Sequence, residues 1–299
     1  VSITYQAVGE EPPSATDMAD TIYKLQQRVE NYSTEAIVYQ EGLDRINIAG
    51  AGLAGLSAAI ALAKKEIQSN LISVQPSERA QSVMAEGGIN AALDTMNESD
   101  TTREHFEDTM RGGVFLADPN AVRGLVTHAP EIVLWLKNLG VPFQMKNGVI
   151  QLRNFGGQKK KRTAYAKSST GKVVMTALID EARKYEAGGL IHRFMHHEIL
   201  EPVIRNGTCM GLWIQDTFSG NIDMLPGSVI LAVGGMNGLF PQKTTGTVSN
   251  SGAVCAAAFT QGAELGNLEF IQFHPTTVQI AGKRMLISEA ARGEGGRLF

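Results

Sequence analysis

Residues 46–55 read Ile46-Asn47-Ile48-Ala49-Gly50-Ala51-Gly52-Leu53-Ala54-Gly55. The apolar residues Ile46–Ala49 predict a short buried strand, and the small residues that follow predict a helix from Leu53 to Lys65. A second strand is expected at Asn70–Val74. Strand, glycine turn, helix and strand in this order predict the start of a β-α-β unit and an α/β fold.

Each glycine of the turn has its own physical role. Gly50 makes the turn, Gly52 lets backbone N–H groups approach a pyrophosphate, and Gly55 allows the helix to pack closely on the strand. The partial positive charge of the helix N-terminus favours phosphate. A glycine-rich turn without a ligand is the alternative, because the motif alone is a weak signal. Ser73-Val74-Gln75 replaces the acid that usually binds ribose after the second strand, which disfavours an ordinary NAD enzyme.

Two further glycine pairs suggest close approach to a ligand. Gly87-Gly88 lies in the small-residue segment 82–92, just past the second strand, where backbone could approach a flat ring system. Gly234-Gly235 ends a later apolar strand that begins at Ser228.

The rest of the chain predicts helices and a change to strands. Two helices are expected within 101–139, the second at Ala121–Leu139, and another at Lys172–Tyr185. From Leu190 to Ile230 short strands with turns predict an antiparallel insertion. A leader helix is expected within residues 1–44.

Composition restricts the class of protein. With 299 residues, 43% of them apolar, and a net charge of −3, the chain is expected to be soluble and globular, without attraction to nucleic acid or direct membrane insertion. The run Lys159–Arg162 is either a local cationic spot or a solvated loop. Two cysteines with no metal spacing suggest a reducing compartment, so the cytoplasm is the expected location.

The C-terminal part of the sequence contains candidate catalytic and substrate-binding residues. His274-Pro275-Thr276 follows an apolar lead-in, and the segment 288–296 contains Glu289 and Arg292. A histidine, a carboxylate and an arginine could act together on one anionic substrate. A lone histidine after an apolar strand is otherwise more often a core residue.

With these stretches in order, the chain resembles the flavoprotein subunit of the succinate dehydrogenase and fumarate reductase family, which includes L-aspartate oxidase. Phe155-Gly156-Gly157-Gln158 and Arg162-Thr163 add to the match. The resemblance implies a Rossmann-like FAD-binding domain with an antiparallel β insertion at 45–238. It also implies the beginning of an α+β capping domain at 239–299, and so the N-terminal part of a longer flavoprotein with an incomplete active site.

The resemblance also implies which residues bind FAD. Members joined to membrane complexes carry a flavin-linked histidine where this chain has Gln81, and an amide cannot make that bond, so FAD is expected to be dissociable. The expected cofactor-binding residues are Gly50, Gly52, Ala54, Gly55, Ser73, Gln81, Ser82, Ala85, Glu86, Gly87, Gly88, Ile199, Ala232, Gly234, Gly235 and Ser251.

The reaction implied is interconversion of fumarate and succinate. Arg292 is then the proton-delivering residue, with Glu289 passing protons to it, and His274, Thr276 and Ser288 bind the substrate. A carboxylate clamp or a structural salt bridge is the alternative for Arg292.

Two other functions stay open. One is amine oxidation as in L-aspartate oxidase, which Phe155 disfavours because aspartate oxidases carry an acid there to pair with the substrate ammonium. The other is a non-catalytic flavin-binding module. The expected partners are a small dicarboxylate and an iron–sulfur or other electron-transfer subunit, through which the protein could lie at the inner face of a membrane.

Overall fold

A four-stranded parallel sheet carries the glycine turn. Its strands, in the order β12–β1–β2–β8, are Val229–Leu231, Ile46–Ala49, Ser69–Ser73 and Ile191–Met195. The computed structural model describes residues 45–155, 158–274, 276–280, 282–287 and 295–297. All five residues of β2 are buried, as expected for a parallel strand with both faces covered.

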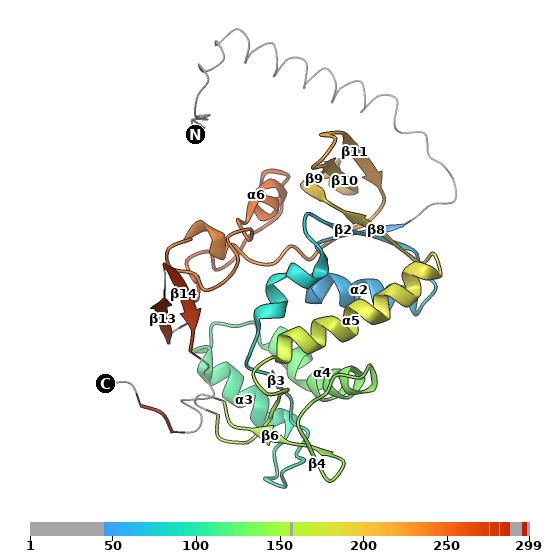
Figure 1. The fold of residues 1–299 in the computed structure, drawn as a ribbon. Helices are drawn as coiled ribbons and strands as arrows, with labels where there is room; N and C mark the ends of the chain where they lie inside the picture. Colours follow the sequence, from blue (N-terminus) through green and yellow to red (C-terminus); the bar gives the residue numbers. More distant parts are fainter. Residues whose placement is uncertain (1–44, 156–157, 275, 281, 288–294, 298–299) are drawn as a thin grey trace. The chain divides into compact units, whose positions relative to one another are not determined.

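Helices cover one face of this sheet (Figure 1). Helix α2 (Leu53–Ala63) follows β1, and α5 (Thr170–Ala187) packs beside it before the chain enters β8. Ile48 and Leu71 of the sheet share a core with Leu56 and Ile60 of α2 and Leu178 of α5. The predicted β-α-β unit is therefore present, and its helix ends two residues before the predicted end.

A three-stranded antiparallel sheet covers the other face. It consists of β9 (His197–Arg205), β10 (Thr208–Asp216) and β11 (Ile222–Pro226), and Figure 1 shows it across the parallel sheet from α2. Leu212 and Ile214 pack on Ala49 and Ile72. The insertion was expected to start at Leu190, but β8 pairs in parallel with β2, because the α5 crossover returns the chain in the same direction.

Helices α3 (Thr102–Gly112) and α4 (Pro119–Asn138) lie between β2 and α5 in the sequence. The hydroxyl of Thr101 caps α3 by accepting from the Glu104 N–H at 3.1 Å. Arg162 joins α3 to the region of β7 through Asp100 and Asp108. The short strands around this core are β3 Ile89–Asn90, β4 Met145–Lys146, β5 Val149–Ile150, β6 Leu152–Arg153 and β7 Thr163–Ala164.

The later part of the chain contributes helix α6 (Ala253–Thr260) and a hairpin of β13 (Thr277–Ile280) and β14 (Lys283–Leu286). Three 3-10 turns, Ser77–Arg79, Gln81–Met84 and Asn237–Leu239, connect the elements. Among the described residues, none of the helices combines the length and apolar character needed to span a bilayer. The leader helix in residues 1–44 lies outside the described residues, and the domain boundary at 238 stays a prediction.

Candidate cofactor and substrate site

In the first glycine turn, the packing of the protein requires glycine at two positions but not at the third. A Cβ on Gly55 would lie 1.8 Å from the carbonyl oxygen of Gly50, and one on Gly50 would lie 2.3 Å from that of Ala232. At Gly52 the nearest atom would be the Ser82 hydroxyl at 3.5 Å, an ordinary contact. Protein packing therefore explains Gly50 and Gly55 but not Gly52, for which the close approach of a pyrophosphate stays a prediction.

The turn leads directly into helix α2, whose first turn contains no acidic residue and whose N-cap is Gly52 with no side-chain cap. The backbone N–H of Leu53 donates to the Ser82 hydroxyl at 3.2 Å. Ser82 thereby links the N-terminal end of α2 to the segment after β2. This arrangement fits the diphosphate of FAD, since backbone N–H groups and the helix dipole favour anions.

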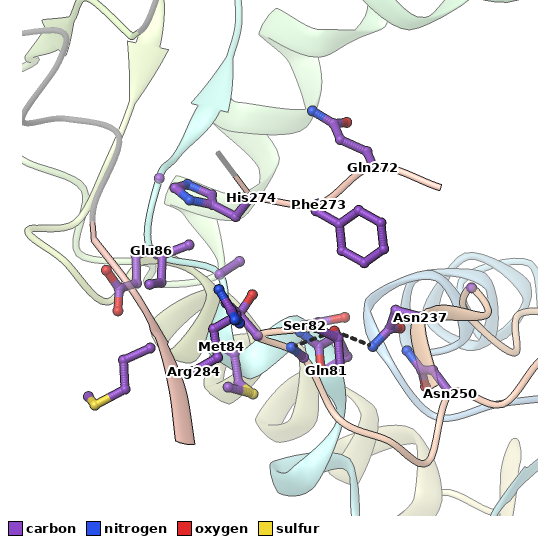
Figure 2. Close-up of a pocket in the computed structure, with 18 of the residues that line it drawn as sticks. Gln81, Ser82, Met84, Glu86, Asn237, Asn250, Gln272, Phe273, His274 and Arg284 are labelled. Atoms are coloured by element: carbon purple, nitrogen blue, oxygen red, sulfur yellow. Dashed lines mark hydrogen bonds between the residues drawn. The ribbon is translucent and has the colours of Figure 1, made fainter. Parts of the chain in front are cut away.

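A cavity of about 1250 Å³ lies on the other side of Ser82. Its lining includes Gln81, Ser82 and the segment Ala85–Gly88, together with Gly234-Gly235 and His274. Figure 2 shows side chains from the segment 81–86 and from the later segments 237–250 and 272–284 around this cavity. The structure therefore brings together three stretches that the sequence separates by up to nearly two hundred positions.

The Gly87-Gly88 segment is held by side chains from the region of β6. Arg153 Nη2 donates to the carbonyl oxygen of Gly87 at 2.6 Å. A Cβ on Gly87 would lie 2.8 Å from the ring of Phe155, and one on Gly88 would lie 2.6 Å from the carbonyl oxygen of Ala164. The glycines thus let the backbone pack closely against Phe155 and Ala164, and Gly87, Gly88 and Phe155 all line the cavity.

Gln81 connects this segment to the loop 244–252. Its side-chain oxygen accepts the backbone N–H of Thr247 at 2.6 Å, and it lines the cavity. Asn237 donates to the same loop, to the Thr244 hydroxyl and the Thr247 carbonyl oxygen, both at 3.0 Å. Gln81 therefore serves as a hydrogen-bond acceptor at the position where a covalent link to flavin would require a nucleophilic side chain.

His274 is oriented by its own chain. Its Nδ1 lies 2.9 Å from the carbonyl oxygen of Thr276, and all of its described contacts use Nδ1. The same Thr276 oxygen accepts the N–H of Ile287 at 3.0 Å, and the Thr276 hydroxyl donates to the carbonyl oxygen of Ile287 at 3.2 Å. Thr276 thus supports His274, and Nε2 is left to contact a ligand.

The remaining predicted residues lie at several places. Ser73 ends β2 with a buried hydroxyl that has no partner among the described residues, which suits a ribose contact. Ile199 packs behind the sheet in β9, next to Ile214, and Ser251 accepts from the Ala253 N–H at 3.4 Å; neither lines the cavity. Ser288, Glu289 and Arg292 lie outside the described residues.

Several cavity residues were not predicted from the sequence. They include Asn237, Asn250 and Gln272 from the loops, and Gln279 and Arg284 from the β13–β14 hairpin. Asn250 lies next to Ser251, and Gln272 lies in the apolar lead-in to His274, so both are close to predicted residues. Asn237, Gln279 and Arg284 lie in no recognisable motif.

Comparisons with known proteins agree with this geometry. Residues 46–299 match the family described as FAD binding domain. The chain is 38% identical over 256 residues to the succinate dehydrogenase flavoprotein subunit of Bacillus subtilis, an alignment that covers 85% of this chain and 44% of the relative. It is 34% identical over 254 residues to L-aspartate oxidase 2 of Ralstonia nicotianae, covering 84% of this chain and 46% of that protein.

A solved structure shows the same arrangement. The FrdA chain of E. coli quinol fumarate reductase, in a mutant form, superimposes with a TM-score of 0.78 at 30% identity and covers 84% of this chain and 42% of that chain. The chain spans less than half the length of these relatives. The turn, the cavity and the matches together show that this chain belongs to the FAD binding domain family, that its cofactor is FAD, and that succinate dehydrogenase and fumarate reductase flavoprotein subunits are among its relatives.

Proposed function

We propose that this chain binds FAD without a covalent bond and contributes to a site that interconverts fumarate and succinate. The observation that supports the proposal is one cavity whose lining combines Gln81, Ser82 and residues 84–88 with Gly234-Gly235 and His274. Bound FAD would supply the hydride chemistry. The residues of the chain must then hold the dicarboxylate, exclude water and move a proton.

His274 is the described residue best placed to bind a substrate carboxylate. Because the carbonyl oxygen of Thr276 can only accept, its contact with His274 needs a proton on Nδ1, and Nε2 is then a second donor when the ring is protonated. A hydrogen bond to a carboxylate whose charge increases during reduction would stabilise the transition state more than the ground state.

Arg292 and Glu289 are proposed for proton transfer on the resemblance alone. The pKa of a guanidinium is above about 12, so an arginine that donates a proton needs a relay to replace it. Glu289 is the proposed relay. The alternative is that Arg292 binds a carboxylate through a bidentate pair without transferring a proton.

The surroundings of Phe155 favour a substrate without an amine. Its ring lies against Gly87 at the cavity, and the guanidinium of Arg153 lies 5.7 Å from the ring centroid. An ammonium group would need a carboxylate at this place, and it meets an apolar ring with a cation behind it. We therefore favour a dicarboxylate over L-aspartate, although an L-aspartate oxidase is among the relatives.

The electron partner is proposed by analogy with the relatives. One of them is the flavoprotein subunit of an 8-methylmenaquinol:fumarate reductase of Wolinella succinogenes, 38% identical over 257 residues. We propose that an electron-transfer subunit, of the iron–sulfur type that the resemblance implies, receives or supplies the electrons. Such a partner would place the protein at the inner face of a membrane.

The test is a flavin difference spectrum. The chain is loaded with FAD, freed of excess, and titrated with succinate and malonate. We expect a saturable change that is weakened at least about tenfold in His274→Gln and is unaltered in His128→Gln, whose histidine is exposed on α4. Bound FAD that neither dicarboxylate perturbs, or hydrogen peroxide production on addition of L-aspartate, would contradict the proposal.

A further inference from the structure

We infer that Arg284 is a substrate-binding residue, which pairs with one carboxylate of a dicarboxylate in the cavity that also contains His274. The inference rests on the proposed function, because it names the positive charge that this ligand would meet. Arg284 lies on β14 and lines the cavity together with Gln279 of β13. Figure 2 shows Arg284 among the cavity side chains, on a different segment from His274.

The hairpin fixes the direction of the Arg284 side chain. Arg284 is directly opposite Gln279 in the antiparallel pairing, and Thr277 is opposite Leu286. Directly paired residues project from the same face of a hairpin, and so do the residues two positions further along. Accordingly Arg284 Nη1 donates to the Thr277 hydroxyl at 3.1 Å, and Gln279, Arg284 and Leu286 all line the cavity.

The same hairpin also orients His274. The carbonyl oxygen of Thr276 meets His274 Nδ1 at 2.9 Å and accepts the N–H of Ile287, the residue after β14, at 3.0 Å. His274 and Arg284 are therefore attached to one small hydrogen-bonded frame. A rigid pair of donors separated by a fixed span can select an anion with two acceptor groups.

The charge of Arg284 has no counter-charge in the described part of the chain. Its described partner is the neutral hydroxyl of Thr277, and its Nε is buried with no partner among the described residues. Glu86 also lines the cavity but forms no ion pair with Arg284. Because a buried guanidinium N–H without an acceptor is costly, a ligand carboxylate would satisfy it.

Two other buried or half-buried arginines are paired with carboxylates, and a third is held by a carbonyl oxygen and an aromatic ring although its Nε, like that of Arg284, has no partner among the described residues. Arg162 pairs with Asp100 and Asp108, and Arg193 pairs with Glu186. Arg153 binds the carbonyl oxygen of Gly87 and lies over Tyr165. Arg284 therefore differs from Arg162 and Arg193 in having no carboxylate partner among the described residues, and from Arg153 in lining the cavity.

A purely structural role for Arg284, as a pin between the two strands of the hairpin, makes a different prediction. The loss of the pin would weaken binding of every ligand that depends on His274, whether it carries one carboxylate or two. Loss of a carboxylate partner would weaken only the ligand with two carboxylates. The comparison of malonate with the monocarboxylate crotonate separates these roles.

The experiment uses the FAD-loaded full chain and the flavin difference spectrum as readout. We expect Arg284→Gln to weaken malonate binding about 10-fold or more, as for loss of a charged hydrogen bond, and to change crotonate binding less than about 3-fold. Arg284→Lys, which keeps the charge but loses the planar fork, should lie between. The matched control is Arg205→Gln, at an exposed position where β9 ends, and it should bind malonate like the wild type.

The outcomes distinguish the two proposals. Equal losses for malonate and crotonate, or no loss for malonate, overturn the role of Arg284 while the dicarboxylate site stands. Wild-type chain that takes up FAD but responds to neither succinate nor malonate overturns both proposals. If Arg284→Gln does not take up FAD, Arg284→Lys decides: a loss of about threefold or more confined to malonate supports the inference, and equal binding contradicts it.

Discussion

Arg153 Nη2 donates to the carbonyl oxygen of Gly87 at 2.6 Å, while its guanidinium lies 4.2 Å from the ring centroid of Tyr165. The two residues of this hydrogen bond are 66 positions apart. The bond fixes the glycine pair that lies at the cavity, from behind and through a charged donor. Arg153 is thus a positioning residue for the backbone that is proposed to contact the flavin.

Arg153→Met should weaken FAD binding by about tenfold, because a charged hydrogen bond to a partly buried carbonyl contributes about 1.5–3 kcal/mol. Quenching of FAD fluorescence during titration with the chain measures this affinity. Arg103→Met is the matched control, since that side chain is 88% exposed on α3. Equal affinities in the wild type and Arg153→Met would show that the Gly87 backbone needs no such support.

Gly52→Ala should impair FAD binding, whereas Gly55→Ala should impair stability. Gly52→Ala should fold normally, since its Cβ meets the Ser82 hydroxyl at an ordinary 3.5 Å, but should bind FAD at least about tenfold more weakly, a change of about 1.4 kcal/mol. Gly55→Ala should lower the free energy of unfolding by about 3 kcal/mol or more, because its Cβ would lie 1.8 Å from the Gly50 oxygen. Urea unfolding and FAD titration of both variants check this. An unchanged FAD affinity in Gly52→Ala would remove the pyrophosphate from this turn.

Asp100→Asn should strongly destabilise the chain. The side chains of Asp100 and Arg162 are each 1% exposed and form a bidentate pair at 2.8 and 3.1 Å, and removal of one partner of a buried pair costs about 3–5 kcal/mol. The exposed pair Arg103–Glu107 is the comparison, and Glu107→Gln should cost about 0.5 kcal/mol or less. Urea unfolding without FAD measures both, and similar small losses would contradict the importance of the buried pair.

His105 should make stability fall in mild acid. Burial lowers the pKa of His105 from 6.5 to about 4. The nearby positive charge of Arg162 lowers this pKa further, and the negative charge of Asp108 partly opposes the shift. Above pH 6.5 the His105 ring is neutral in both the folded and the unfolded chain, so it does not change the free energy of unfolding there. Between 6.5 and about 4 only the unfolded chain takes up the proton, so the free energy of unfolding decreases as the pH falls.

His105→Gln should reduce this dependence. The difference in the free energy of unfolding between about pH 7 and about pH 5 should shrink by about 2 kcal/mol relative to the wild type. His128→Gln is the control, because that side chain is 71% exposed. A pH dependence that is the same in all three chains would assign acid sensitivity to other groups.

The local parts of the fold could be predicted from the sequence. Strand β1 has its predicted bounds, and α2, α4 and α5 lie within two residues of theirs, because strand and helix periodicity are local properties. The assignment of β8 to the insertion was wrong because its partner β2 is more than a hundred positions earlier. For the run Lys159–Arg162 the sequence offered a cationic spot or a solvated loop, but Arg162 is buried in an ion pair with Asp100. That partner lies 62 positions away, so local sequence could not identify it.

For the candidate site too, only residues that lie in local motifs could be predicted from the sequence. Gly52, Gly87 and His274 could be proposed as site residues from motifs, since each lies in a short stretch with a recognisable pattern, and Gly87 and His274 line the cavity. Gln81 and Thr247 are 166 positions apart, and their contact has no local signature. Arg284 lies in a hairpin without a motif, so its position at the cavity could be known only from the structure.

The most direct test of the central claim is an absorption spectrum of the FAD-loaded chain before and after acid precipitation. A glycine turn, a flat backbone segment and Gln81 around one cofactor predict a yellow protein with flavin close to equimolar. Because Gln81 cannot form a covalent link, all of the flavin should appear in the acid supernatant. A colourless chain that does not take up added FAD would contradict the cofactor site, and flavin retained in the pellet would contradict its dissociable binding.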